Sequence, residues 1–263
     1  MNIQPLYSIN FGVNLNSTKL KFSRNDFFVK INGYGKNNEW ADEVIKTADL
    51  GSSLICRGTT CENILKIIAA GVKRANHKNN DLNRAINTGI LRVNRDGWFS
   101  KIADAYTNYK INRYKSYEER LNLAAKNSFS VPNEKVAITT IEKKSTTLKH
   151  GDPLRINNSL EYIFKLFNKL FPKYLDKVTQ ADLTAINETI AEIRWVMAHA
   201  TPWLRGSDAI SNVFMRSMYK ALGIKSFPLK KGVSLDFEAY CTNLTEYKKN
   251  FVSLFEAAPK IVQ

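Results

Sequence analysis

The chain has 263 residues, enough for one domain with a large core or for two small domains. Its hydrophobic and charged fractions, 44% and 24%, are those of an ordinary globular protein, and no apolar run reaches the roughly 18 residues of a membrane-spanning helix. The net charge is +15 at pH 7, but the lysines are scattered rather than gathered on one element, so nucleic-acid binding is not expected.

Charge and cysteine content also bear on partners and compartment. The positive charge is explained equally by solubility and by attraction to an acidic partner, the phosphates of a cofactor, nucleic acid or an anionic membrane surface. Cys56, Cys61 and Cys241 cannot all pair with one another, and no nearby histidine completes a zinc set. We therefore expect no disulfide framework, no metal site, and a monomer that works in a reducing cytosol.

The elements predicted for the first part of the chain are mixed. Residues 1–18 are polar and rich in asparagine and serine, which predicts a flexible leader that resembles the secretion signals of type III effectors. Residues 19–32 alternate in polarity and predict a hairpin, and residues 41–48 predict a short helix. Residues 54–57 predict a buried strand, followed by an amphipathic helix that stops at Gly71.

The later part of the chain is predicted to be mainly helical. Residues 75–90 read as a loop, and 129–131 and 136–141 as strands rich in β-branched residues. Amphipathic periodicity then predicts helices over 159–171, 179–200 and 207–222. We expect an α+β fold in which a flexible leader, 1–18, precedes a single catalytic domain, 19–263. The mixed α/β part of this domain would be 19–150 and its mainly helical part 151–263.

The arginine at the end of the predicted strand is unusual. A charged side chain in a buried strand is costly unless an anion meets it. The strand, Arg57, the Gly58-Thr59 turn and the helix ending at Gly71 resemble the first motif of bacterial toxin ADP-ribosyltransferases of the Arg-Ser-Glu type. The resemblance implies a mixed β core in which Arg57, Gly58 and Thr59 bind NAD.

A second segment of the chain is similar to the serine motif of the same family. Trp98-Phe99-Ser100 gives the aromatic residue and the serine, although Lys101 and Ile102 replace the small hydroxyl residues of the family. The resemblance implies that Ser100 supports the catalytic glutamate and that Trp98 and Phe99 line the nicotinamide pocket. The alternative is that Ser100 caps a helix ahead of Asp104.

The long helix predicted over 179–200 has two faces. Glu188, Glu192, Trp195 and His199 recur at helical spacing opposite an apolar stripe. The stripe, which should face the core, consists of Leu183, Ile186, Ile190, Ile193, Met197 and Ala200. A tryptophan and a histidine beside two carboxylates favour a groove in which a ring stacks and a carboxylate acts. An interdomain helix whose tryptophan and histidine pack on the β half is the alternative.

Cleavage of the nicotinamide–ribose bond passes through an oxocarbenium-like state that a carboxylate stabilises. We expect Glu192 to be that catalytic carboxylate, with Glu134 and Glu142 as alternatives. Trp195 and Arg205 are expected to line the cofactor site, with Arg205 just before a helix N-terminus that could hold a phosphate.

Together these resemblances imply an NAD-dependent protein ADP-ribosyltransferase, a glycosyltransferase that a bacterial secretion system delivers into the host cytosol. Its acceptor would be a host protein. One effector family of this sort modifies ubiquitin, but nothing in the sequence selects ubiquitin over another acceptor.

Two other functions fit parts of the sequence. Residues 201–208 resemble a worn Fic-type loop, in which a helix, an anion-binding loop and a second helix follow in this order. Thr201 stands in place of the histidine, and Ser207-Asp208-Ala209 in place of Asn-Gly-Arg. This resemblance implies a degenerate Fic-like nucleotidyltransferase or a pseudoenzyme. The third candidate is a basic, non-enzymatic module that binds a host factor.

Overall fold

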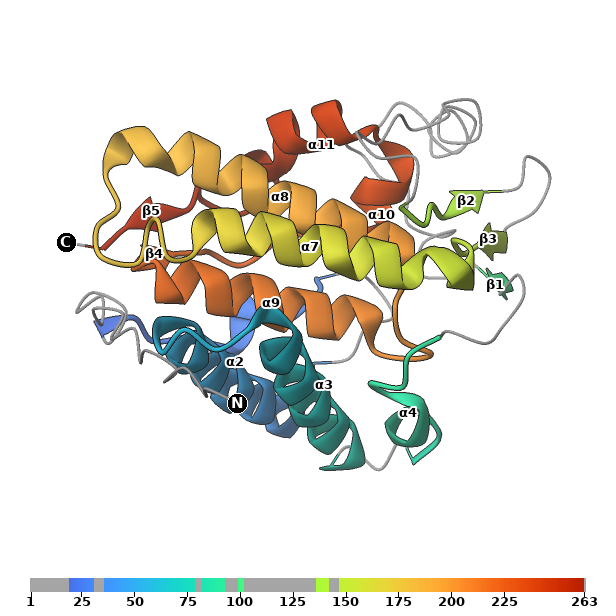
Figure 1. The fold of residues 1–263 in the computed structure, drawn as a ribbon. Helices are drawn as coiled ribbons and strands as arrows, with labels where there is room; N and C mark the ends of the chain where they lie inside the picture. Colours follow the sequence, from blue (N-terminus) through green and yellow to red (C-terminus); the bar gives the residue numbers. More distant parts are fainter. Residues whose placement is uncertain are drawn as a thin grey trace, which may run out of the picture.

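The computed structural model describes residues 19–30, 36–78, 82–92, 99–101, 136–141 and 147–262, and within these it is mainly helical (Figure 1). The helices are, in order, η1 (Arg24–Asp26), α2 (Asn38–Cys56), α3 (Cys61–Lys78), α4 (Leu82–Asn87), η2 (Pro153–Arg155), α7 (Ile156–Leu170), η3 (Gln180–Asp182), α8 (Leu183–Ala200), α9 (Ser207–Ala221), α10 (Leu235–Cys241), α11 (Leu244–Asn250) and η4 (Phe251–Leu254). The expected α+β fold with an ADP-ribosyltransferase-like β core is therefore wrong. The leader expected over 1–18 lies outside the described residues.

The strands of the described residues are short and lie at the edges of the helical body (Figure 1). β1 (Phe99–Lys101), β2 (Thr140–Ile141) and β3 (Thr147–Lys149) form an antiparallel sheet in the order β1-β3-β2. β4 (Ile224–Lys225) pairs with β5 (Lys260–Ile261). Strands of two or three residues offer no face on which a core could form, so the core is made of helix side chains.

The segment predicted as a strand, 54–57, is the end of helix α2. The backbone N–H of Arg57 donates to the Ser53 carbonyl at 3.1 Å, and the Arg57 side chain is exposed. Residues 54–56 are the last turn of a long helix whose inward positions, such as Val44 and Ala48, are buried. A short apolar run is compatible with a strand or with part of a helix. Residues 54–56 are helical because they continue the longer helical period of α2. The Arg57 charge therefore needs no anion to offset burial.

The predicted hairpin over 19–32 is also wrong for its described part, because residues 19–30 contain the 3₁₀ helix η1 and no strand. Helix α3 does not stop at Gly71 but continues to Lys78. A Cβ atom on Gly71 would lie 2.9 Å from the Cβ of Thr47 on α2, and closer still to the rest of that side chain. Gly71 thus allows α2 and α3 to approach closely, which is a packing role and not a helix stop.

The predicted helices of the C-terminal half are confirmed. α7 ends before Pro172, Thr179 precedes the short helix that leads into α8, and Gly223 follows α9 with a φ of 69°. Helix α8 contacts α7, α9, α10 and α11, and is buried on all sides from residue 190 to 200. In the described part of the chain, no helix is both long and apolar enough to cross a membrane.

We expect the Gly71→Ala substitution to lower the free energy of unfolding by about 1–3 kcal/mol, because the added methyl group overlaps Thr47. Denaturant unfolding measures this change. Thr47→Ala alone should cost less, and combining it with Gly71→Ala should recover much of the lost stability, since the methyl group then has room. A double variant no more stable than Gly71→Ala alone would contradict this account of the contact.

Candidate functional site

The path of the loop between α8 and α9, residues 201–206, is defined by its backbone conformation and by a hydrogen-bonded serine at the start of α9. Thr201 adopts left-handed backbone angles, φ 44° and ψ 60°, and ends α8 sharply. The Ser207 hydroxyl accepts a hydrogen bond from the Trp203 N–H at 3.2 Å and contacts the Trp203 carbonyl at 3.1 Å. Gly206, with a φ of 82°, leaves room for Thr88 against the loop.

Residues 88–92 lie along this loop and pair with it. The Leu204 N–H donates to the Ile90 carbonyl at 2.8 Å, and the Arg92 N–H donates to the Pro202 carbonyl at 2.8 Å. Isolated bridges also link Thr88 with Arg205 and Leu91 with Trp203. The loop and residues 88–92 therefore form one hydrogen-bonded unit.

The Arg92 side chain is completely buried beneath the loop. Its Nη2 donates to the carbonyls of Gly151 at 2.6 Å and Ala200 at 3.0 Å, and its Nε donates to the Thr201 carbonyl at 3.1 Å. Burial lowers the pKa of Arg92, while the Asp152 charge opposes this shift. The guanidinium thus binds the carbonyls that α8 leaves without helical partners at its end.

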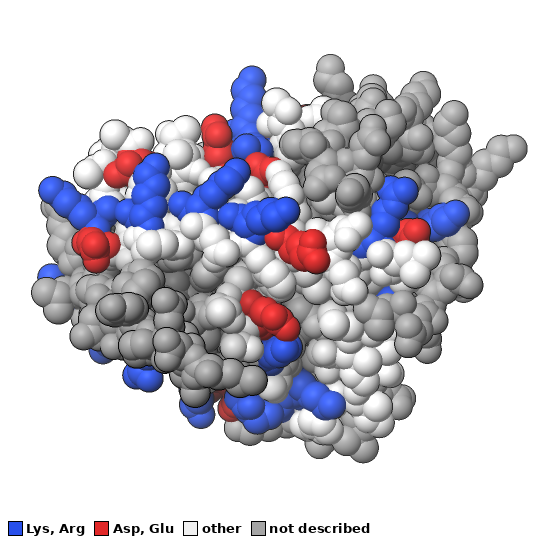
Figure 2. Space-filling model, viewed as in Figure 1, with Lys and Arg blue, Asp and Glu red and all other residues white. Residues whose placement is uncertain are grey.

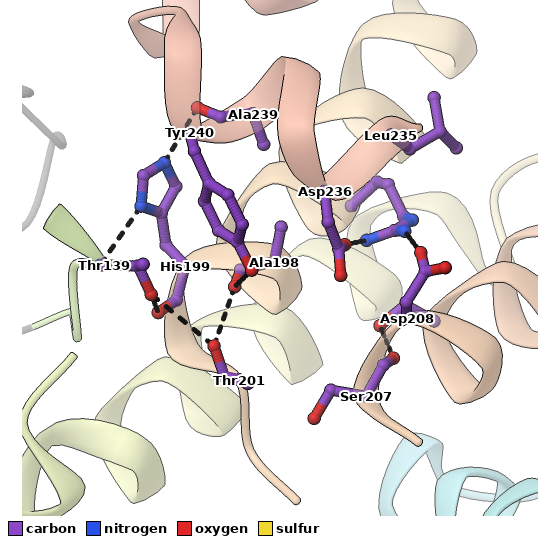
Figure 3. Close-up of polar contacts among 12 residues, drawn as sticks. Thr139, Ala198, His199, Thr201, Ser207, Asp208, Leu235, Asp236, Ala239 and Tyr240 are labelled. Atoms are coloured by element: carbon purple, nitrogen blue, oxygen red, sulfur yellow. Dashed lines mark hydrogen bonds and ion pairs between the residues drawn. The ribbon is translucent and has the colours of Figure 1, made fainter. Parts of the chain in front are cut away.

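Two buried histidines contribute to the end of α8: His199 lies in its last turn (Figure 3), and His150 contacts the residue that follows it, Thr201. His199 Nδ1 accepts the Thr139 N–H at 3.2 Å, and its Nε2 lies 3.0 Å from the Ala239 carbonyl, so Nε2 carries the proton. Burial lowers the pKa of His199 to about 4. His150 Nδ1 lies 3.0 Å from Thr201 Oγ1, and burial, followed by the Arg92 charge, lowers the pKa of His150 to about 4. Both rings are therefore neutral at pH 7.

Arg194 of α8 pairs with two carboxylates, Asp208 at the start of α9 and Asp236 in α10, both of which are labelled in Figure 3. The buried Arg194 guanidinium donates through Nη1 to Asp236 Oδ1 at 2.5 Å and through Nη2 to Asp208. Burial and the nearby Asp236 charge raise the pKa of Asp208. The Asp208 side chain is 38% exposed against 15% for Asp236, so Asp208 is the member of this group that reaches solvent.

A groove of about 610 Å³ adjoins the loop, between α3 and α7. Residues 88–91 and Trp203 form its third side. Its apolar lining is Leu65, Ala69, Ala70, Ile90, Leu91, Leu160, Phe164 and Trp203, and its polar lining is Glu62, Lys66, Lys73, Thr88, Gly89, Asn157 and Glu161. An apolar groove with a few polar groups is the usual form of a small-molecule site.

The residues expected to act together on α8 have structural partners. The Tyr162 hydroxyl donates to Glu192 Oε1, and the Lys248 ammonium lies 3.0 Å from Glu192 Oε2. Trp195 is buried and donates through Nε1 to the Thr242 carbonyl at 3.1 Å. Helices α10 and α11 cover the face of α8 on which a groove was expected. The catalytic role of Glu192 stays a prediction.

The other predicted site residues are spread over separate elements. Arg57 is exposed after α2, next to Gly58 and Thr59, and no hydrogen bond or ion pair joins it to Glu192. The exposed Arg205 is the member of the predicted set that lies in the α8–α9 loop. Phe99 and Ser100 are in β1. Trp98, Glu134 and Glu142 lie outside the described residues, and no group of side chains in the described part fits a metal ion.

Sequence reasoning missed Arg92 and the groove. Ile90-Leu91-Arg92 carries the same signal that drew attention to Arg57, an arginine that directly follows apolar residues. The loop predicted over 75–90 stops short of Leu91 and Arg92, and this prediction is wrong in part, because the end of α3 and helix α4 lie within that range. The groove could not be inferred, because its sides come from parts of the chain that are far apart in sequence.

The pKa of His199 predicts a loss of stability in acid. Folded His199 takes up a proton only near pH 4, whereas unfolded histidine does so near 6.5, so its contribution is present above pH 6.5 and is lost as the pH falls toward 4. That contribution is roughly 3 kcal/mol. In thermal unfolding from pH 8 to 4, His199→Gln should show a shallower decline than the wild type. His77→Gln, at an exposed site on α3, is the control, and parallel curves for His199→Gln and wild type would refute the assignment.

Comparison with known proteins identifies the family. The AvrB/AvrC family of avirulence proteins matches residues 124–258, just over half of the 263-residue chain. No curated protein matches the chain. The matched range contains the α8–α9 loop with Arg194, Asp208 and Asp236, whereas α3 and residues 88–92 lie outside it. The match confirms the expected bacterial effector and does not indicate an ADP-ribosyltransferase. The chain belongs to the AvrB/AvrC family of avirulence proteins, which are bacterial virulence effectors.

Proposed function

We propose that this effector binds a donor containing a nucleoside diphosphate in the groove and transfers part of that donor to a host protein. The observation that carries the proposal is the groove of about 610 Å³, whose one side is hydrogen-bonded to the loop between α8 and α9. Ligand sites in proteins commonly have volumes of about 300–1,000 Å³. A bacterial secretion system would deliver the protein into the host cytosol.

The lining of the groove suits such a donor. Trp203 and Phe164 supply aromatic surface, and Leu65 and Leu160 supply aliphatic surface, against which a base can pack. Lys73 is half-buried and makes no ion pair within the described part of the chain, so its ammonium is the best candidate for a phosphate contact. Lys66 is paired with Glu62 at 2.7 Å on the exposed surface of α3.

The surface charge also favours an anionic donor. Figure 2 shows lysine and arginine side chains in a row over the end of α7 and the turn that follows it. The exposed lysines of this stretch are Lys165, Lys169, Lys173 and Lys177. Together with the net charge of +15, they raise the local concentration of a polyphosphate near the groove.

The order of α8, loop and α9 supports a Fic-type relation more than an ADP-ribosyltransferase relation. The helix, the loop and the second helix follow as that resemblance requires. Thr201 does not replace the missing histidine as a base, because a threonine hydroxyl is not basic at neutral pH. ATP and NAD both contain ADP, so the same groove suits nucleotide transfer and ADP-ribose transfer alike. The donor has to be found by experiment.

We expect the purified protein to label a discrete host protein when it is incubated with a eukaryotic cell lysate and radiolabelled ATP or NAD. Label from ATP alone would identify nucleotide transfer, and label from NAD alone would identify ADP-ribose transfer. Ala70→Phe should abolish the label, because Ala70 is an exposed residue of the groove lining and a phenyl ring there occupies the groove.

Ala185→Phe is the matched control, since Ala185 is an exposed helical alanine outside the groove. This variant should label as the wild type does. No label from either donor, or equal labelling by both variants, would overturn the proposed function. In the NAD reaction, Glu192→Gln tests the predicted catalytic glutamate: an unchanged rate would remove Glu192 from the site.

Lys73→Gln should weaken binding of the active donor about tenfold or more, because a charge-assisted hydrogen bond to phosphate is lost. Isothermal titration with ATP and with NAD measures this change. Lys46→Gln, at an exposed lysine of α2 outside the groove, should leave the affinity unchanged. Equal affinities for the Lys73 variant and the wild type would exclude Lys73 as the phosphate ligand.

A further inference from the structure

We propose that Arg92 is a positioning residue that joins the side of the groove formed by residues 88–91 to the α8–α9 loop, so that an occupant of the groove sets the conformation of the loop. The inference rests on the proposed function in one respect, namely that the groove is the ligand site. It assigns a role to a residue that would not itself touch the donor.

Residues 88–92 serve two surfaces at once. Thr88, Gly89, Ile90 and Leu91 line the groove, and the next residue, Arg92, is completely buried on the side of the loop. Ile90 and Leu91 are 44% and 41% exposed, so the groove side of this segment is open to an occupant. A displacement of residues 88–91 must therefore move the backbone that carries Arg92.

The Arg92 side chain binds the segments that define the site. Its hydrogen bonds reach the carbonyls of Ala200 and Thr201, at the end of α8, and of Gly151, next to β3. Carbonyls at the end of a helix have no helical donors, and a positive charge there is favourable. No carboxylate forms an ion pair with Arg92 in the described part of the chain, so these carbonyls provide its main stabilisation.

The left-handed conformation of Thr201 depends on this arrangement. A non-glycine residue with positive φ is strained by about 1–3 kcal/mol and persists only where its surroundings fix it. The Arg92 Nε fixes the Thr201 carbonyl, and the Arg92 N–H fixes the carbonyl of the next residue, Pro202. Together with the contacts of the Thr201 hydroxyl with the Ala198 carbonyl and His150 Nδ1, Arg92 therefore sets the direction in which the chain leaves α8.

The network around Arg92 is not saturated. The buried Nη1 has no hydrogen-bond partner in the described part of the chain. A buried donor without a partner costs free energy. The observed conformation of the loop is therefore less strongly favoured over a shifted conformation than it would be if every donor of Arg92 were bonded. A ligand that contacts residues 88–91 can therefore shift the loop through Arg92 at a moderate cost.

Amide hydrogen exchange in the full chain, measured by NMR, tests the inference without any donor. Arg92→Lys keeps the charge but loses the fork of donors, and exchange of the Leu204 N–H should accelerate about tenfold or more. Exchange in α2 and α11 should stay unchanged. Arg155→Lys, at an exposed arginine before α7, is the matched control and should alter neither.

Ala70→Phe serves in the same experiment as a built-in occupant of the groove. In the wild-type background it should slow exchange of the Leu204 N–H severalfold, and in the Arg92→Lys background this effect should disappear. Ala185→Phe should have no effect in either background. A purely structural Arg92 would instead accelerate exchange throughout the protein and leave the effect of Ala70→Phe the same in both backgrounds.

The inference would be overturned if Arg92→Lys left the exchange of the Leu204 N–H unchanged or accelerated amide exchange equally throughout the protein. It would also be overturned if Ala70→Phe slowed Leu204 exchange as much in the Arg92→Lys background as in the wild type. If Arg92→Lys does not fold, Ala70→Phe in the wild-type background still decides whether an occupant of the groove acts on the loop. Slower exchange at Thr88, whose N–H donates to the Ala85 carbonyl and not to the loop, without any change at Leu204 would show that the groove and the loop are not joined. Because no donor is used, failure of the labelling experiment would leave this result standing, and the reverse also holds.

Discussion

Helix α8 is buried on every side from residue 190 to 200, and each polar side chain in that stretch must find its partner on a neighbouring element. Arg194 donates hydrogen bonds to Asp208 of α9 and Asp236 of α10, and His199 donates one to the Ala239 carbonyl of α10. A buried charge without its partner is strongly destabilising, by about 3–5 kcal/mol. These contacts therefore fix how α9 and α10 pack against α8, the helix around which α7, α9, α10 and α11 are arranged.

The packing of α8 determines the geometry of the candidate site, which consists of the α8–α9 loop and the groove beside it. Because α8 and α9 fix the two ends of the loop, they limit the paths that the chain between them can take, and Ser207 hydrogen-bonds to Trp203 across it. The groove then forms where this loop meets residues 88–91, α3 and α7. It joins the part of the chain that matches the avirulence family to helices that precede the match. The loop belongs to the matched part, and much of the groove does not.

The ADP-ribosyltransferase-like fold was predicted wrongly because two short segments of the sequence have a different structure from the one that their composition indicates. Residues 54–57 have the composition of a buried strand, but residues 54–56 form the last turn of α2, which begins at Asn38, and Arg57 follows it on the surface. Gly71 has the position of a helix stop, yet it lies inside α3 because Thr47 requires a residue without a side chain there. Short windows of sequence do not separate these cases, since the deciding contact comes from another element.

The sequence by itself determined the helices α7, α8 and α9 and their ends, because amphipathic periods of fifteen residues or more with proline or glycine beyond them leave few alternatives. It also determined the apolar stripe of α8 and the unusual chemistry of Glu192, Trp195 and His199. The tertiary structure decided which side chains surround these three residues. Tyr162, Lys248 and Thr242 approach α8 from other helices and segments and occupy the face that appeared open to a ligand. Only such long-range packing could place Arg92 beneath the α8–α9 loop and form a groove beside it, because helical periodicity shows which face is apolar and not which neighbour covers the other.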